Sequence, residues 1–141
     1  MKKLLAMVLA LVMTLSLAVS ANAAFKDDKS ISDDYAESVA VLNGMGVFKG
    51  YEDGSFKPSG NVTGYEVLAM ILRAVGYDKN NEFSGADWAL HVAQTAQQLG
   101  VLDNVAKTTD LNAPASRELV AELLFQGIQK AQVTYTPAFG Y

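Results

Sequence analysis

Four stretches of the chain carry apolar residues at the three- and four-residue spacing of one helix face. They span residues 35–42, 65–75, 88–99 and 117–129. The spacing is clearest in the second and fourth stretches, at Leu68, Ile71, Leu72 and Val75 and at Val120, Leu123, Leu124 and Ile128. A stripe of this kind predicts an amphipathic helix. The pattern therefore predicts four helices and a mainly α protein.

The four predicted helices form two similar halves, each a helix, a loop and a second helix. The first helix of each half ends in a matching glycine segment, Met45-Gly46-Val47 and Leu99-Gly100-Val101. Glycine favours this place because it tolerates left-handed backbone at a helix C-terminus. A helix–loop–helix unit of this size cannot bury its own apolar stripe, so the halves should pack on each other or on another copy. We predict two repeats in a small helical bundle.

The repeats set the expected domain boundaries. Polar residues dominate the connection between the halves, and a β-prone run follows the last predicted helix. The predicted parts after the N-terminal leader are repeat 1 at 24–76, a linker at 77–87, a diverged repeat 2 at 88–130 and a C-terminal tail at 131–141.

The N-terminus has the pattern of a secretory signal peptide, which we place at residues 1–23. Lys2 and Lys3 precede an apolar run from Leu4 to Val19, and Ala21-Asn22-Ala23 supplies small residues for cleavage after Ala23. The alternative is a retained membrane anchor. The apolar run is shorter than the roughly 20 residues of a spanning helix, and no basic stop-transfer cluster follows it. The sequence therefore predicts export, with no membrane attachment after cleavage.

Composition narrows the function of the exported chain. The formal charge of −4 becomes more negative once Lys2 and Lys3 are removed, and no basic cluster remains to bind nucleic acid or anionic lipid. The absence of cysteine excludes a lipoprotein, a disulfide scaffold, a thiolate nucleophile and a cysteine-ligated metal. The single histidine, His91, has no nucleophile or metal partner in the sequence pattern. The sequence predicts neither an enzyme nor a cofactor.

The loop of the first half carries a specific motif. Residues 50–58 read Gly-Tyr-Glu-Asp-Gly-Ser-Phe-Lys-Pro, and residues 62–66 read Val-Thr-Gly-Tyr-Glu. This resembles the repeat of the S-layer homology (SLH) family, which runs G-Y-x-D-G-x-F-x-P and then I-T-R-A-E. The second half lacks that loop, but it keeps matching residues at Trp88-Ala89, Gly100-Val101, Pro114 and Ser116-Arg117.

The resemblance implies a function and a location. SLH modules attach surface proteins non-covalently to secondary cell-wall polysaccharide, which often carries a pyruvate ketal. The chain is accordingly expected at the bacterial wall or S-layer, bound to that polymer. Three repeats typically form one unit, so association with a second copy or with other SLH repeats is also expected. The alternative is a structural or assembly module that has the SLH fold and does not bind glycan.

The resemblance and local chemistry together give six candidate ligand-binding residues. In the family the arginine of T-R-A-E is associated with ligand contact; Arg117 holds that place in the second half, and Gly64 replaces it in the first. An arginine at the first position of a helix lies beside free N–H groups that favour a carboxylate. The candidates are Arg117, Ser116, Tyr51, Asp53, Gly64 and Lys57.

Several polar residues also have structural interpretations. Thr63 and Glu66 have the spacing of a capping box, whereas Ser116 can cap the last helix without a glutamate partner. Asp53 precedes Gly54 in a tight-turn pair and is the more typical turn residue than ligand. We expect Arg73, near a helix C-terminus, to be solvated.

Overall fold

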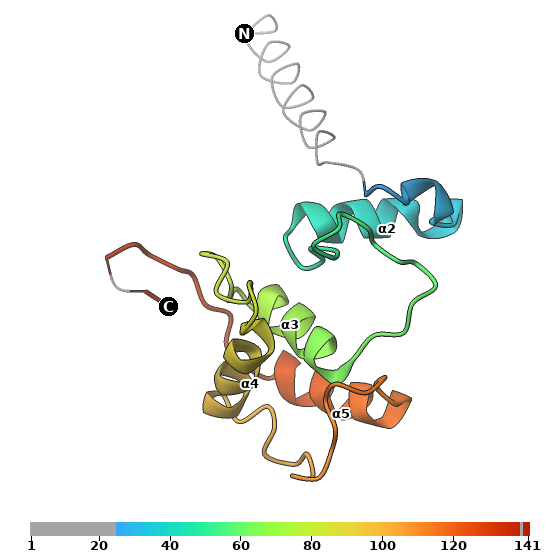
Figure 1. The fold of residues 1–141 in the computed structure, drawn as a ribbon. Coiled ribbons are helices and arrows are strands. Elements are labelled where there is room, and N and C mark those ends of the chain that lie inside the picture. The colour runs from blue at the N-terminus through green and yellow to red at the C-terminus, as the bar shows by residue number, and fades with distance from the viewer. Residues whose placement is uncertain (1–24, 139) are drawn as a thin grey trace, which may run out of the picture. The chain divides into compact units, whose positions relative to one another are not determined.

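The computed structural model describes residues 25–138 and 140–141 (Figure 1). The predicted signal peptide and its cleavage site lie outside these residues. The described part contains four α-helices, a short 3₁₀-helix and isolated β-bridges in place of strands. The mainly α prediction is therefore confirmed. The helices are η2 (Asp28–Ser30), α2 (Asp33–Gly44), α3 (Gly64–Ala74), α4 (Trp88–Gln98) and α5 (Arg117–Ile128).

The chain forms two compact units, one up to Pro58 and one from Ser59 onward. In the N-terminal unit, α2 begins with Asp33 and Asp34, which favour the positive end of the helix dipole. It ends before Gly46, whose φ of 77° is left-handed, as the sequence predicted. Among the described residues of this unit, Val39 and Val47 are the buried apolar ones. The hydrophobic interior that they form is correspondingly small.

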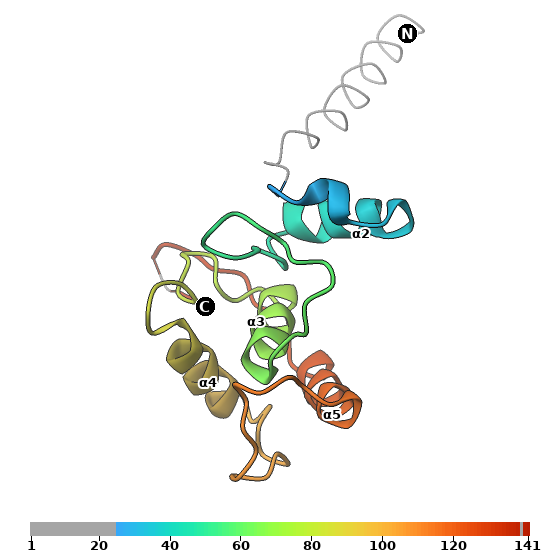
Figure 2. The ribbon, with the colours of Figure 1, turned by 45° about the vertical axis from the view of Figure 1, so that its right-hand side comes forward.

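The C-terminal unit is organised around α3. This helix packs against both α4 and α5 (Figures 1 and 2). Its buried residues include Val67, Leu68, Ala69, Ile71 and Leu72. They join a core completed by Val92 and Ala96 of α4, Leu123 of α5, and Phe83 and Val101 from the loops. Because α3 is covered by two helices, its apolar stripe is wider than a one-sided surface helix requires.

The approach of α5 to α3 depends on a glycine. Gly127 is buried in α5, and a Cβ atom at this position would overlap the Ile71 side chain of α3. The two helices therefore come closer than a larger residue would allow. Trp88 also packs against the core and meets Tyr65 edge-on, with ring centroids 6.4 Å apart. This is the anchoring position expected of a tryptophan at a helix start.

The segment from Tyr77 to Asp87 forms a loop of the C-terminal unit that packs against the core of this unit. Phe83 is part of the core, and Asp78 is buried. The tail returns to the same region, where the Val133 N–H donates to the Val75 carbonyl oxygen at 2.9 Å. None of the described helices has the length and apolar character needed to cross a membrane.

Candidate functional site

The motif loop of the N-terminal unit folds as a hydrogen-bonded turn. The Gly54 N–H donates to the Tyr51 carbonyl oxygen at 2.8 Å, and the Tyr51 N–H donates to the Ser55 carbonyl oxygen at 2.9 Å. The Asp53 carboxylate accepts from both the N–H and the hydroxyl of Ser55, at 2.9 and 2.6 Å. These bonds favour the charged carboxylate, so they lower the pKa of Asp53. Asp53 is therefore a turn-forming residue within the loop.

Residues just before η2 hold the other side of the loop. The Lys26 N–H donates to the Gly54 carbonyl oxygen at 3.0 Å. The two carboxylate oxygens of Asp27 accept from the N–H groups of Phe56 and Lys57, each at 2.8 Å. These two bonds lower the pKa of Asp27. Asp27 is not apparent from the sequence, because a contact spanning about thirty residues leaves no mark in local spacing.

The loop brings Tyr51 and Lys57 together. The Lys57 ammonium lies 3.9 Å from the centroid of the Tyr51 ring, a cation–π contact. Both residues are exposed. Behind them, Phe56 packs against Phe25 and Phe48, with ring centroids 5.0 and 5.7 Å away. The loop thus presents one cation and one aromatic ring on an apolar support.

The N-terminus of α3 is occupied by the protein itself. Thr63 and Glu66 form the predicted capping box: the Thr63 hydroxyl accepts from the Glu66 N–H, and the Glu66 carboxylate accepts from the Thr63 N–H. Gly64 is buried, and the next N–H, of Tyr65, donates to the Leu111 carbonyl oxygen at 3.1 Å. A Cβ at Gly64 would lie 2.7 Å from the Leu111 Cδ2 atom and 3.2 Å from its Cα. Glycine is therefore what lets the Leu111 segment cover this helix end.

The N-terminus of α5 is more open. The Ser116 hydroxyl accepts from the Leu119 N–H at 3.1 Å, so the predicted single cap is confirmed. Arg117 follows at the first helical position and is exposed. No described residue forms a hydrogen bond or ion pair with its guanidinium. The α5 start therefore offers a cation next to a helix N-terminus.

A short backbone bridge joins the starts of α3 and α5. Thr63 pairs with Pro114, and the Ala115 N–H donates to the Val62 carbonyl oxygen at 2.9 Å. Within the C-terminal unit, Gly64 thus lies near Ser116 and Arg117. The other three candidates, Tyr51, Asp53 and Lys57, share the loop of the N-terminal unit.

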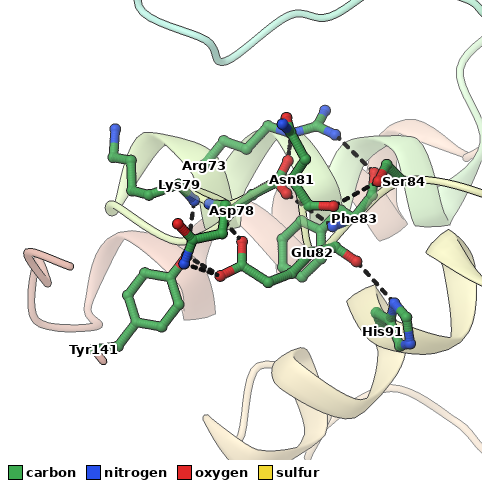
Figure 3. Close-up of polar contacts among 10 residues, drawn as sticks. Arg73, Asp78, Lys79, Asn81, Glu82, Phe83, Ser84, His91 and Tyr141 are labelled. Carbon is green, nitrogen blue, oxygen red and sulfur yellow. Dashed lines mark hydrogen bonds and ion pairs between the residues drawn. The ribbon is translucent and has the colours of Figure 1, made fainter. Parts of the chain in front are cut away.

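The environment of Arg73 differs from the solvated position expected from the sequence. Its Nε donates to the Asp78 carboxylate at 2.7 Å, and only 12% of its side chain is exposed (Figure 3). The Asp78 side chain is fully buried and accepts from the Phe83 N–H at 2.8 Å as well. The solvated role expected for Arg73 is therefore wrong, because the 78–83 loop folds back over it.

The same loop also holds the end of the chain. The Tyr141 hydroxyl accepts from the Lys79 N–H at 2.8 Å and donates to the Glu82 carboxylate at 2.9 Å (Figure 3). Desolvation raises the pKa of Tyr141 to about 12. His91 Nδ1 lies 2.8 Å from the Glu82 carbonyl oxygen. These polar groups form hydrogen bonds with one another. No cluster of metal-ligating side chains occurs in the described residues.

Residues 24–68 match the family model of the S-layer homology domain. A middle cell wall protein of Brevibacillus brevis is 35% identical over 89 residues, 63% of this chain and 8% of its own length. A surface layer protein of Brevibacillus choshinensis is 42% identical over 57 residues, 40% of this chain and 5% of its own length. No solved structure matches the chain.

Enzymes are also among the proteins similar to this chain. An amylopullulanase of Thermoanaerobacterium thermosulfurigenes is 31% identical over 107 residues, 68% of this chain and 6% of its own length. The chain spans less than a tenth of the length of each of these three relatives. The match therefore transfers no enzymatic activity, since the shared part is an anchoring domain. The resemblance of residues 24–68 to the S-layer homology domain is therefore confirmed, and this domain occurs in S-layer and cell-wall surface proteins such as the two from Brevibacillus.

Proposed function

We propose that the exported chain attaches non-covalently to the bacterial wall by binding secondary cell-wall polysaccharide, with a pyruvylated polymer as the preferred ligand. The family match carries this proposal, because it covers the motif loop that presents Tyr51 and Lys57. The relatives that share the stretch include a middle cell wall protein and a surface layer protein. Export through the predicted signal peptide would deliver the chain to that polymer.

Arg117 is the proposed contact for a carboxylate of the polymer. An exposed guanidinium at the first position of α5 combines its own charge with the positive end of the helix dipole. The chain has a formal charge of −4, so an acidic polymer requires a local cation to overcome the overall repulsion. Ser116 presents Arg117 by capping the helix, and Gly64 shapes the adjoining backbone without supplying a side chain.

The loop of the N-terminal unit is the proposed second contact. The exposed face of an aromatic ring can pack against the apolar face of a sugar ring, and Tyr51 lies in an exposed turn. Lys57 supplies a cation next to that ring. Asp53 acts through the turn, because its Oδ1 atom accepts both hydrogen bonds from Ser55.

Retention on purified cell wall tests the proposal. The mature protein is mixed with wall that retains its secondary polymer and with wall stripped of it, and the bound fraction is measured. Retention should require the polymer, and Arg117→Ala should reduce it. Lys107→Ala removes an exposed cation of the same unit and should leave retention unchanged. Equal retention on both walls, or none on either, would refute polymer binding.

A second candidate function is assembly without glycan binding. Three apolar side chains on α5 remain exposed at 44%, 58% and 71%: Leu124, Phe125 and Ile128. A second copy or another SLH repeat could cover them. Sedimentation velocity of the mature protein should then show a dimer or larger species that Phe125→Ser converts to monomer. A monomeric wild type that still binds wall polymer would exclude this alternative.

A further inference from the structure

The structure assigns Asp27 as the residue that positions the Tyr51–Lys57 pair. Its two carboxylate oxygens accept from consecutive backbone N–H groups, those of Phe56 and Lys57. Asp27 is not one of the six candidate residues. It lies on the segment before η2. Its consequence for ligand binding rests on the proposed function, whereas its effect on the loop does not.

The backbone at Lys57 explains why such an acceptor is needed. Lys57 has a φ of 56°, in the left-handed region that residues with a Cβ rarely adopt. Two charge-assisted hydrogen bonds from one carboxylate fix the orientation of the peptide groups on either side of Phe56. The Asp27 carboxylate is charged at neutral pH, and the hydrogen bonds from Phe56 and Lys57 lower its pKa further. The favourable bonds thus offset the unfavourable backbone at Lys57.

This backbone directs the Lys57 side chain toward Tyr51. The ammonium lies 3.9 Å from the ring centroid, while the Tyr51 N–H is held by Ser55 on the far side of the same turn. The turn fixes Tyr51, and Asp27 fixes Lys57. If Lys57 returned to ordinary right-handed or extended backbone, its side chain would leave in another direction.

The segment that carries Asp27 is itself fastened to the loop. The Phe25 ring packs on Phe56 at 5.0 Å, and the Lys26 N–H donates to Gly54. Gly50 permits the close approach, because a Cβ there would lie 2.6 Å from the Phe25 ring. Residues 25–27 therefore hold the loop together. Within this segment, Asp27 supplies the charged acceptor for the Phe56 and Lys57 N–H groups.

For an acidic polysaccharide, the pairing has a specific use. Tyr51 offers a ring face to a sugar, and Lys57 offers an ammonium to a carboxylate on that sugar or on its neighbour. Asp27 bonds through both oxygens to the backbone, so its own charge is partly neutralised there rather than directed at the ligand. We expect Asp27 to raise affinity without touching the polymer.

Asp27→Asn tests the assignment against Asp28→Asn, its matched control. Asparagine has nearly the same shape but retains only one acceptor oxygen, whereas Asp28 is the neighbouring acidic residue and is exposed. The first measurement is NMR of the mature protein. Lys57 methylene protons should lose their ring-current shift from Tyr51 in Asp27→Asn only, and the Phe56 and Lys57 amides should move with them. Unchanged Lys57 signals in Asp27→Asn would overturn the positioning role.

The second measurement is affinity for purified wall polymer. Asp27→Asn should weaken binding about tenfold, the effect expected from losing one hydrogen bond to a charged group, and Asp28→Asn should not. Lys57→Gly removes the ammonium and the backbone strain together. In that background Asp27→Asn should change affinity by less than about twofold, because its effect passes through Lys57.

The two measurements separate the possible failures. A wild type that binds no polymer defeats the proposed function, while the NMR comparison still decides whether Asp27 positions Lys57. A wild type that binds, with Asp27→Asn binding equally well, overturns the contribution of Asp27 to affinity. An equal tenfold loss from Asp27→Asn in the Lys57→Gly background would show that Asp27 acts on the polymer by another route.

Discussion

Replacing Asp78 with alanine should strongly destabilise the C-terminal unit. The Asp78 side chain is fully buried, it pairs with Arg73 at 2.7 Å, and it accepts from the Phe83 N–H at 2.8 Å. Alanine would leave Arg73, whose side chain is only 12% exposed, without its counter-charge, and would leave the Phe83 N–H without its acceptor. Removing one partner of a buried ion pair costs about 3–5 kcal/mol. This is a large part of the ~5–15 kcal/mol that stabilises a typical domain.

The single tryptophan makes the measurement selective. Trp88 packs against the core of the C-terminal unit, so its fluorescence in a urea titration follows the unfolding of that unit. Asp103→Ala is the control, since Asp103 is an exposed loop residue, and it should change the unfolding free energy by less than about 0.5 kcal/mol. A loss below about 1 kcal/mol for Asp78→Ala would refute the reasoning, because the pair would then contribute no more than a surface ion pair.

A double variant distinguishes the two costs. Arg73→Met with Asp78→Asn removes both charges and keeps an amide oxygen that can accept from the Phe83 N–H. It should recover most of the stability lost in Asp78→Ala, because the unpaired buried charge is gone. If it were as unstable as the single variant, the lost hydrogen bonding of the loop would account for the effect.

Two further predictions concern Gly64 and Asp27. Gly64→Arg introduces the arginine of the family motif and should destabilise the C-terminal unit by about 1–3 kcal/mol in the same urea assay. The reason is that its Cβ would lie 2.7 Å from the Leu111 side chain. Unchanged stability would contradict this packing. The second prediction concerns acid. The hydrogen bonds from Phe56 and Lys57 lower the pKa of Asp27 from 3.8, so its stabilising contribution is fully present above pH 3.8 and is lost as pH falls through the lowered pKa. The NMR shifts of the Phe56 and Lys57 amides should therefore titrate with a midpoint below pH 3.8. A midpoint above that value would contradict the prediction.

The helices could be predicted because their signals are local. Apolar spacing, the capping box of Thr63 and Glu66, and the glycine after α2 all depend on residues a few positions apart. Steric preferences and helix-capping hydrogen bonds also act between residues a few positions apart. Local sequence is therefore enough to explain where these helices begin and end. The motif loop was recognisable for the same reason, because each residue of 50–58 has a fixed place in one turn.

The candidate site was predicted less completely. Tyr51 and Lys57 were named separately, and their 3.9 Å contact depends on an acceptor thirty residues away from Lys57. Gly64 is a candidate binding residue because it holds the place of the family's arginine, and only the structure shows that the Leu111 segment covers this helix end. Arg73 was expected in solvent and instead pairs with a buried carboxylate. For Lys57 and Gly64 the deciding partner comes from a distant part of the chain, and for Arg73 it comes from the loop that follows its helix.

The sequence alone therefore determined the helix positions, the caps, the motif loop and, through that loop, the family. Tertiary structure decided which charged groups are committed to the fold and which remain available. Asp27, Asp78 and Arg73 are bound to other parts of the protein, while Arg117 stays exposed at the start of α5. The physical reason is that burial and long-range hydrogen bonding depend on how segments pack, and local residue spacing carries no information about that packing.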